Sequence, residues 1–309
     1  MDAANSCGVA ANQSAWCELV RLYVVLITGQ VLNCAREHKR AVSERTSKSR
    51  SNPQSCCHMP ENSRPCKTSK PTRDDIVVVH SSDLHIDADP GLNGSCMSNL
   101  AVVLEAAQRV GADLVLLAGD TFDSHRQPAQ LVARVGEMIA AASMHVVILP
   151  GNHDPVIPEA VYHRMLSNAA DNLHIIGMTH HEAVKFAEFD LEVWGRAHRS
   201  YDDMDPFKRI RARRTRWQIA MAHGHYEPEP DRSTRLRPAW LIGDAELAAT
   251  RSDYVALGHW NRAVDVGNAG VPAHYSGSPD YAGTVNVVRL TGPGDVLVER
   301  ESVDNRSRF

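Results

Sequence analysis

The sequence predicts an α/β fold, because short runs of β-branched and apolar residues alternate with Ala- and Leu-rich stretches of helical periodicity. This pattern begins at Ile76. Three of the apolar runs lead directly into clusters of Asp, Asn or His. The loops at the carboxyl ends of strands line the ligand crevice in open α/β sheets, so we expect these clusters to converge.

Strands and helices alternate in the first half of this region. Strands are predicted at 76–79, 113–118 and 145–149, and helices at 99–110 and 128–142. Apolar residues recur at three- and four-residue spacing in both helices, which predicts that each buries one face against a sheet.

The second half has a more β-rich pattern. Strands are predicted at 191–194, 217–222, 253–257, 284–290 and 296–301. The basic run from Lys208 to Arg216 is predicted to form a helix capped by Asp205, with Pro206 at its first position. We interpret its arginines as a solvated face, with contact to a nucleic-acid backbone as the alternative.

Residues 1–74 differ in composition from the rest of the chain. They contain six of the seven cysteines, and their spacing matches no zinc or disulfide pattern. The polar stretch 45–74 has too little apolar surface to offset the entropy lost on ordering. We expect residues 1–74 to be a disordered extension. A start codon assigned too far upstream is an equal alternative, with Met59 as the true start. Residues 75–309 are expected to form one domain.

The charge balance limits the classes of partner. Of the 33 Lys and Arg and the 37 Asp and Glu, residues 1–74 hold 11 and 6, which leaves 22 and 31 for residues 75–309. A formal charge of about −9 argues against a protein that coats nucleic acid by bulk charge. The apolar run 22–27 is shorter than the ~20 residues of a membrane span, and its flanks make a poor signal peptide. We therefore expect a cytoplasmic protein with no membrane partner, and export is the alternative.

Five polar clusters stand at the ends of predicted strands. They are Asp83-Leu84-His85, Gly119-Asp120, Gly151-Asn152-His153-Asp154, His223-Gly224-His225 and Gly258-His259. Residues i and i+2 of a strand share a face, so Asp83 and His85 are expected to point into one crevice. Carboxylate, amide and imidazole donors suit Mn²⁺, Fe²⁺ or Zn²⁺, and a carboxylate such as Asp120 is the natural bridge between two ions.

The order of these clusters resembles the calcineurin-like metallophosphoesterases over residues 76–281. The resemblance implies a four-layer α/β/β/α sandwich as the fold. It also implies an enzyme that hydrolyses a phosphodiester with two divalent ions. Mn²⁺ is the expected metal, with Fe²⁺, Zn²⁺ and Mg²⁺ as alternatives. The implied ligands are Asp83, His85 and Asp120 for one ion, and Asp120, Asn152, His223 and His259 for the other.

The resemblance also implies roles beside the metals. His153 corresponds to the histidine that protonates the leaving group or steadies the attacked phosphate, and its neighbour Asp154 is expected to orient it. Either His223 or His225 can be the ligand of its cluster. We favour His223 and place His225 near the substrate. Asn261 stands where the family has a second histidine, so it is either a weaker amide ligand or a loop residue.

Within the family, the segments 83–87, 119–124 and 275–279 look most like the SbcD-type DNA-repair exonucleases. This likeness implies a DNA exonuclease or endonuclease with an SbcC-type ATPase partner, and it implies that Asp123 orders the loop after the bridging aspartate. A phosphodiesterase or phosphatase for small molecules such as nucleotides is the alternative, favoured by the acidic domain. A non-catalytic scaffold is a third hypothesis, which the presence of His153 disfavours.

Histidines without a partner at ligand spacing are expected at the surface, namely His125, His180, His181 and His198.

Overall fold

The computed structural model describes six segments of the chain. These are residues 75–88, 97–167, 170–233, 239–267, 270–292 and 294–303. The chain divides into two units, 1–68 and 69–309, and every described residue belongs to the second. The expectations for residues 1–74 therefore lie outside the described residues.

The first sheet has six strands in the order β12-β11-β1-β2-β3-β4. Its strands are β1 (Ile76–Ser81), β2 (Leu114–Ala118), β3 (His145–Leu149), β4 (Leu173–Ile175), β11 (Thr284–Thr291) and β12 (Asp295–Ser302). β1 to β4 run parallel, and β11 pairs antiparallel with both β1 and β12. The carboxyl ends of β1, β2 and β3 consequently lie at the same end of the sheet.

The second sheet also has six strands, in the order β5-β6-β7-β8-β10-β9. Its strands are β5 (Ala183–Phe186), β6 (Leu191–Gly195), β7 (Trp217–His223), β8 (Tyr254–Gly258), β9 (Val264–Asp265) and β10 (Ala273–Tyr275). β6, β7, β8 and β10 run parallel, and β5 and β9 pair antiparallel at the two edges. This topology brings the ends of β7 and β8 side by side.

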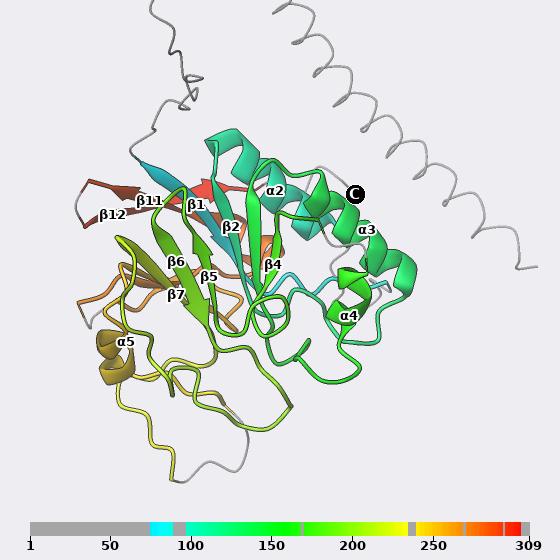
Figure 1. Cartoon of the computed structure of the whole chain (residues 1–309). Helices are drawn as coiled ribbons and strands as arrows, with labels where there is room; N and C mark the ends of the chain where they lie inside the picture. The colour runs from blue at the N-terminus through cyan, green and yellow to red at the C-terminus, as the bar shows by residue number, and fades with distance from the viewer. Residues whose placement is uncertain are drawn as a thin grey trace, which may run out of the picture. The chain divides into compact units, whose positions relative to one another are not determined.

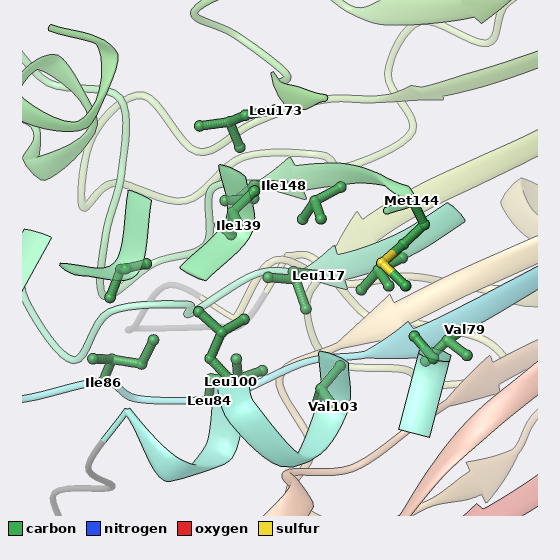
Figure 2. Close-up of a cluster of buried hydrophobic side chains, with 14 of the residues drawn as sticks. Val79, Leu84, Ile86, Leu100, Val103, Leu117, Ile139, Met144, Ile148 and Leu173 are labelled. Carbon is green, nitrogen blue, oxygen red and sulfur yellow. The ribbon is translucent and has the colours of Figure 1, made fainter. Parts of the chain in front are cut away.

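Helices cover the outer face of the first sheet (Figure 1). They are α2 (Ser98–Val110), α3 (Ala129–Ala140) and α4 (Val161–Leu166). Figure 2 shows Leu100 and Val103 of α2 in one buried cluster with Val79 of β1 and Leu117 of β2. Full burial of such side chains contributes about 1.5–3 kcal/mol each, so this cluster fixes the helices on the sheet.

Two further clusters complete the layers. One lies between the sheets and joins residues such as Val78 and Leu116 of the first sheet to Ile219 and Ala256 of the second. The other lies on the outer face of the second sheet, where α5 (Asp244–Thr250) and loops cover it. The short helix α6 (Pro279–Ala282) precedes β11. The predicted four-layer α/β/β/α sandwich is confirmed, with a fourth layer made largely of loops. No helix among the described segments is long and apolar enough to cross a membrane.

The predicted helix in the basic run is wrong. The segment 205–216 consists of turns and irregular structure. Arg211 pairs with Glu192 at 3.0 Å, and Arg213 pairs with Asp253 at 2.7 Å. The segment has no apolar stripe that a helix could bury, and these ion pairs hold it irregular against the second sheet.

Candidate metal centre and active site

Three groups of side chains bring potential ligand atoms within 4.8 Å of one another. They are Asp83, His85 and Asp120; Asp120, His223 and His259; and His85, Asp123 and His153. Asp120 belongs to the first two groups, which is the position expected of a bridging carboxylate. The sheets therefore bring together the side chains that the sequence placed at separate strand ends.

The backbone is held in an unusual conformation where it carries these side chains. Asp83, His85, Asp120 and His259 have positive φ angles of 54°, 45°, 50° and 103°. Left-handed backbone costs about 1–3 kcal/mol at a residue with a side chain, and such strain persists where surrounding structure enforces it. The amides of Asp83 and His85 donate to the carbonyls of Gly119 and Asp120, both at 3.0 Å, so the β1 and β2 loops hold each other in this conformation.

His223 ends β7 and is fully buried. Its Nδ1 lies 2.9 Å from the carbonyl oxygen of Ala118, so Nδ1 is the protonated donor. Its Nε2 faces two acceptors, Asp120 Oδ2 at 3.1 Å and Asn152 Oδ1 at 2.9 Å. Burial lowers the pKa of His223, but the charges of Asp120 and Asp83 outweigh it and raise this pKa to about 9. The pocket therefore favours positive charge at Nε2, as a metal site does.

Glycines make room for the buried imidazole of His223. A Cβ at Gly119 or at Gly258 would collide with its ring, and a Cβ at Gly151 would collide with the carboxylate of Asp120. The glycines that the sequence placed beside the site are therefore required for close packing around the ligands.

His259 links the second sheet to the first. Its amide donates to both carboxylate oxygens of Asp83, at 3.1 and 3.0 Å. Burial and the neighbouring His223 lower the pKa of His259 to about 3, so its ring is a neutral donor at pH 7. Burial raises the pKa of Asp83, and the nearby Asp120 adds to this shift. A divalent cation between the two carboxylates would offset their repulsion, and the donor set fits this requirement.

His85 and His153 share Asp123 as a partner. Nδ1 of His85 lies 3.0 Å from Asp123 Oδ1, which leaves Nε2 of His85 for a metal. Nδ1 of His153 lies 3.0 Å from the carbonyl oxygen of Asp123 and 3.6 Å from its carboxylate. The amide of His153 donates to Asp120 Oδ1 at 2.9 Å, and its side chain is 43% exposed. His153 is therefore held beside the ligand cluster and open to solvent.

The contacts of Asp154 differ from the expected contact with the ring of His153. Its carboxylate is fully buried and accepts hydrogen bonds from the amides of Phe122 and Gly151, at 3.0 and 2.7 Å, and from the Tyr162 hydroxyl at 2.5 Å. Burial raises the pKa of Asp154 to about 6. Asp154 therefore ties the β2 and β3 loops together, and Asp123 holds the ring of His153. Adjacency in the sequence was a poor guide, because neighbouring side chains point in different directions.

The sequence left two assignments open, namely the ligand of the cluster at 223–225 and the role of Asn261. Only His223 of its cluster belongs to a ligand group with Asp120. His225 is 40% exposed, and its Nδ1 accepts a hydrogen bond from Trp260 Nε1 at 3.0 Å. Asn261 is exposed on the loop after β8. The assignment of its side chain as a ligand stays a prediction.

Two residues near the site were missed by the sequence reasoning. His198, expected at the surface, is fully buried, and its Nε2 donates to the carbonyl of His223 at 2.9 Å. The indole of Trp240 lies 5.1 Å from the His198 ring and 5.6 Å from that of His259, with a positive φ of 48° at Trp240. Neither residue stands at ligand spacing from a cluster, so no local signal marked them.

Comparison with known proteins fits this geometry. The model of the calcineurin-like phosphoesterase family matches residues 76–263. The chain belongs to this family. The phosphoesterase is also similar to the SbcD subunit of the nuclease SbcCD of Bacillus subtilis (strain 168), at 25% identity over 272 residues, which cover 72% of this chain and 68% of that protein. The crystal structure of TT1561 of Thermus thermophilus is similar at 14% identity, with a TM-score of 0.49, over 74% of this chain and 99% of that one.

Membership of this family defines the reaction class. The phosphoesterase is a hydrolase that depends on divalent metal ions, and its ligand groups supply the carboxylate and imidazole donors that such ions take.

Proposed function

We propose that the phosphoesterase is a nuclease that hydrolyses phosphodiester bonds in DNA with two Mn²⁺ ions. The observation that carries the proposal is the position of His153, half-exposed and anchored beside the carboxylate that two ligand groups share. The similarity to a nuclease subunit supports DNA as the substrate. The same similarity leads us to propose an ATPase of the SbcC type as its partner.

The ligands divide between two ions in this proposal. Asp83, His85 and Asp120 would hold one ion, and Asp120, Asn152, His223 and His259 would hold the other. Bound divalent ions would polarise the phosphate and lower the pKa of a water molecule. The buried carboxylates and the neutral ring of His259 provide a site of low dielectric in which these effects are strong.

His153 would protonate the leaving oxygen. A carbonyl oxygen only accepts hydrogen bonds, so the contact with Asp123 keeps a proton on Nδ1 of His153. Nε2 is then the atom that takes a second proton and gives it to the departing alkoxide. The Asp123 carboxylate lies 3.6 Å from Nδ1 of His153.

A small-molecule phosphodiesterase is the second candidate, favoured by the acidic charge of residues 75–309. A nucleotide needs no extended basic surface, whereas a long polyanion gains affinity from one.

One experiment separates the two candidates. Full-length protein is assayed with Mn²⁺ on single-stranded DNA, double-stranded DNA, bis(p-nitrophenyl) phosphate and a cyclic nucleotide, beside the variants His153→Asn and His181→Asn. His181 is 78% exposed and serves as the matched control. A nuclease degrades a DNA substrate, loses this activity in His153→Asn and keeps it in His181→Asn. Hydrolysis of the cyclic nucleotide with both DNA forms left intact would contradict the nuclease proposal.

A further inference from the structure

A half-buried tryptophan follows directly after His259 of the metal centre. Trp260 stacks on Tyr275, with ring centroids 4.4 Å apart and an angle of 10° between the ring planes. Its Nε1 donates to Nδ1 of His225 at 3.0 Å. Tyr275 is fully buried and Trp260 is only partly buried. One face of the indole is therefore covered, and part of the ring stays open to solvent.

The segment 275–279 supports the loop that carries this ring. Its first residue, Tyr275, lies against the indole. The amide of Ser278 donates to the carbonyl of Asn261 at 3.2 Å, and a Cβ at Gly277 would come within 2.7 Å of the same oxygen. The loop after β8 is thus ordered before any ligand binds. A ring that is already held in place loses little conformational freedom on binding.

The indole of Trp260 lies beside the catalytic centre. The ring of His225 stands between them, with centroids 5.3 Å from the indole and 6.5 Å from the ring of His259. His259 in turn lies 5.3 Å from the ring of His223. A nucleotide whose phosphate lies at the ligand groups can therefore reach the indole with its base.

A cation and a second aromatic ring extend this surface. Arg262 is exposed on the same loop, and its Nη2 lies 3.5 Å from the hydroxyl of Tyr281 in α6. Tyr281 is itself 62% exposed. Sites for single-stranded nucleic acid combine aromatic rings, which stack on bases, with cations, which contact the backbone. Both kinds of group are present here in a domain whose net charge is acidic.

We propose that Trp260 is a stacking platform for an unpaired base next to the scissile phosphate, and that Arg262 binds a phosphate of the same strand. The proposal rests on the proposed nuclease function and narrows its substrate to a single-stranded segment. A base inside a duplex is stacked between its neighbours and cannot lay its face on the indole. Every base has a π face, so this platform selects an unpaired base and not a particular sequence.

The test compares two single strands of equal length that differ only in their bases. One strand carries thymine at every position, and the other carries abasic sugars. Their Kd values for full-length protein are measured by fluorescence anisotropy, with Ca²⁺ in place of Mn²⁺ to limit cleavage. Both strands have the same phosphates, so the ratio of the two Kd values reports the contacts of the bases. The parent should bind the thymine strand about 5- to 140-fold more tightly, the range expected for one stack on an aromatic ring.

Three variants assign this preference to the indole. Trp260→Ala should lose the preference, and its Kd for the abasic strand should stay at the parent value. Trp260→Phe keeps a ring but no donor to His225, and it should keep most of the preference. Phe189→Ala is the matched control, because Phe189 is a partly buried ring before β6, at the opposite end of the second sheet from His223. It should keep the full preference.

Three results would overturn the stacking. They are equal Kd values for the two strands in the parent, a full preference in Trp260→Ala, and loss of the preference in Trp260→Phe. The first and third decide the question even if Trp260→Ala does not fold. The third would show that the preference depends on the hydrogen bond to His225 instead of the ring.

A second pair of variants tests the phosphate contact. Arg262→Ala should weaken binding of both strands equally and reduce its dependence on salt. Arg134→Ala removes an exposed arginine of α3 and is the matched control, with the parent Kd as the expected result. The same Kd for the abasic strand in these two variants would overturn the contact of Arg262.

The proposed subsite and the proposed nuclease activity can fail separately. If the parent cleaves DNA and binds both strands equally, the subsite is overturned and the nuclease proposal stands. If the parent cleaves no DNA but has a base preference that Trp260→Ala loses, the subsite is supported and the nuclease proposal is contradicted.

Discussion

The strand ends of the two sheets contribute different chemistry to the metal centre. The loops of the first sheet supply both carboxylates, Asp83 and Asp120, and the second sheet supplies the imidazoles of His223 and His259. The first sheet therefore sets the charge of the centre, and the second sheet adds donors and encloses it. Removing a carboxylate should therefore lower catalytic activity more than removing an imidazole.

The largest effect is expected from Asp120→Asn compared with His259→Gln. Removing the shared carboxylate takes negative charge from both ligand groups in a low-dielectric site, so Asp120→Asn should abolish turnover. His259→Gln removes one neutral donor from one group and should chiefly weaken metal affinity, so that added Mn²⁺ restores activity. Steady-state kinetics across a Mn²⁺ titration measures both. If added Mn²⁺ alone restores the activity of Asp120→Asn, the carboxylates of the first sheet are no more important for activity than the imidazoles of the second.

The next effect concerns His153, which follows β3 of the first sheet. It does not belong to the ligand group that contains His223 and His259. His153→Asn should lower kcat by ~10²–10⁴ on esters with poor leaving groups, because these need a proton at the departing oxygen. The loss should shrink with nitrophenolate, and metal content should stay near the parent value. An equal loss on both classes of ester would exclude protonation of the leaving group.

A smaller effect tests a polar contact between the sheets. Nδ1 of His80 in β1 lies 2.9 Å from the Tyr254 hydroxyl in β8, and burial lowers the pKa of His80 from 6.5 to about 3. The unfolded chain takes up a proton below pH 6.5 and the folded chain does not, so this residue lowers stability as pH falls below 6.5. Between pH 7.5 and 5.5 the loss is about 1.4 kcal/mol.

Urea denaturation of the parent and of His80→Gln at these two pH values measures this contribution. The parent should lose more of its free energy of unfolding than the variant does. The same pH dependence in both proteins would show that His80 takes up its proton without unfolding.

The smallest effect is expected in the irregular segment over the second sheet. Arg213 donates to both carboxylate oxygens of Asp253, at 2.7 and 3.1 Å. Because this pair is partly exposed, Arg213→Ala should lower the free energy of unfolding by only about 0.2–1 kcal/mol. The Arg213→Ala variant should bind single-stranded DNA with the same Kd as Arg214→Ala. Arg214 is an exposed arginine of the same segment. A weaker Kd for Arg213→Ala alone would support the contact with a nucleic-acid backbone.

The two regions also differ in how well the sequence predicts them. β1, β2 and β3 begin and end within one or two residues of the predicted bounds, because each is a continuous apolar run that leads into a polar cluster. The elements that were missed contain seven residues or fewer, too few to show a period. They are β4, β5, β9, β10, α4, α5 and α6.

The site follows the same division. The candidate ligand residues could be singled out because each follows a predicted strand or belongs to a motif of the family, and their role as ligands stays a prediction. The positions of Asp154 and His198 could not, because burial of a single side chain depends on contacts made by distant segments. Asp154 is fixed by Tyr162 of α4, and His198 by the backbone of His223. Long-range contacts of this kind leave no pattern in the local sequence.

The left-handed backbone of the ligand residues has a consequence for protein engineering. Grafting Asp83, His85, Asp120 and His259 onto ordinary strand ends of another scaffold would place the right side chains on backbone of the wrong handedness, because all four have positive φ here. A successful graft would have to carry the interlocked loops after β1 and β2, with Gly119 included, as one unit. The transferable part of this centre is therefore a pair of loops and not a set of residue identities.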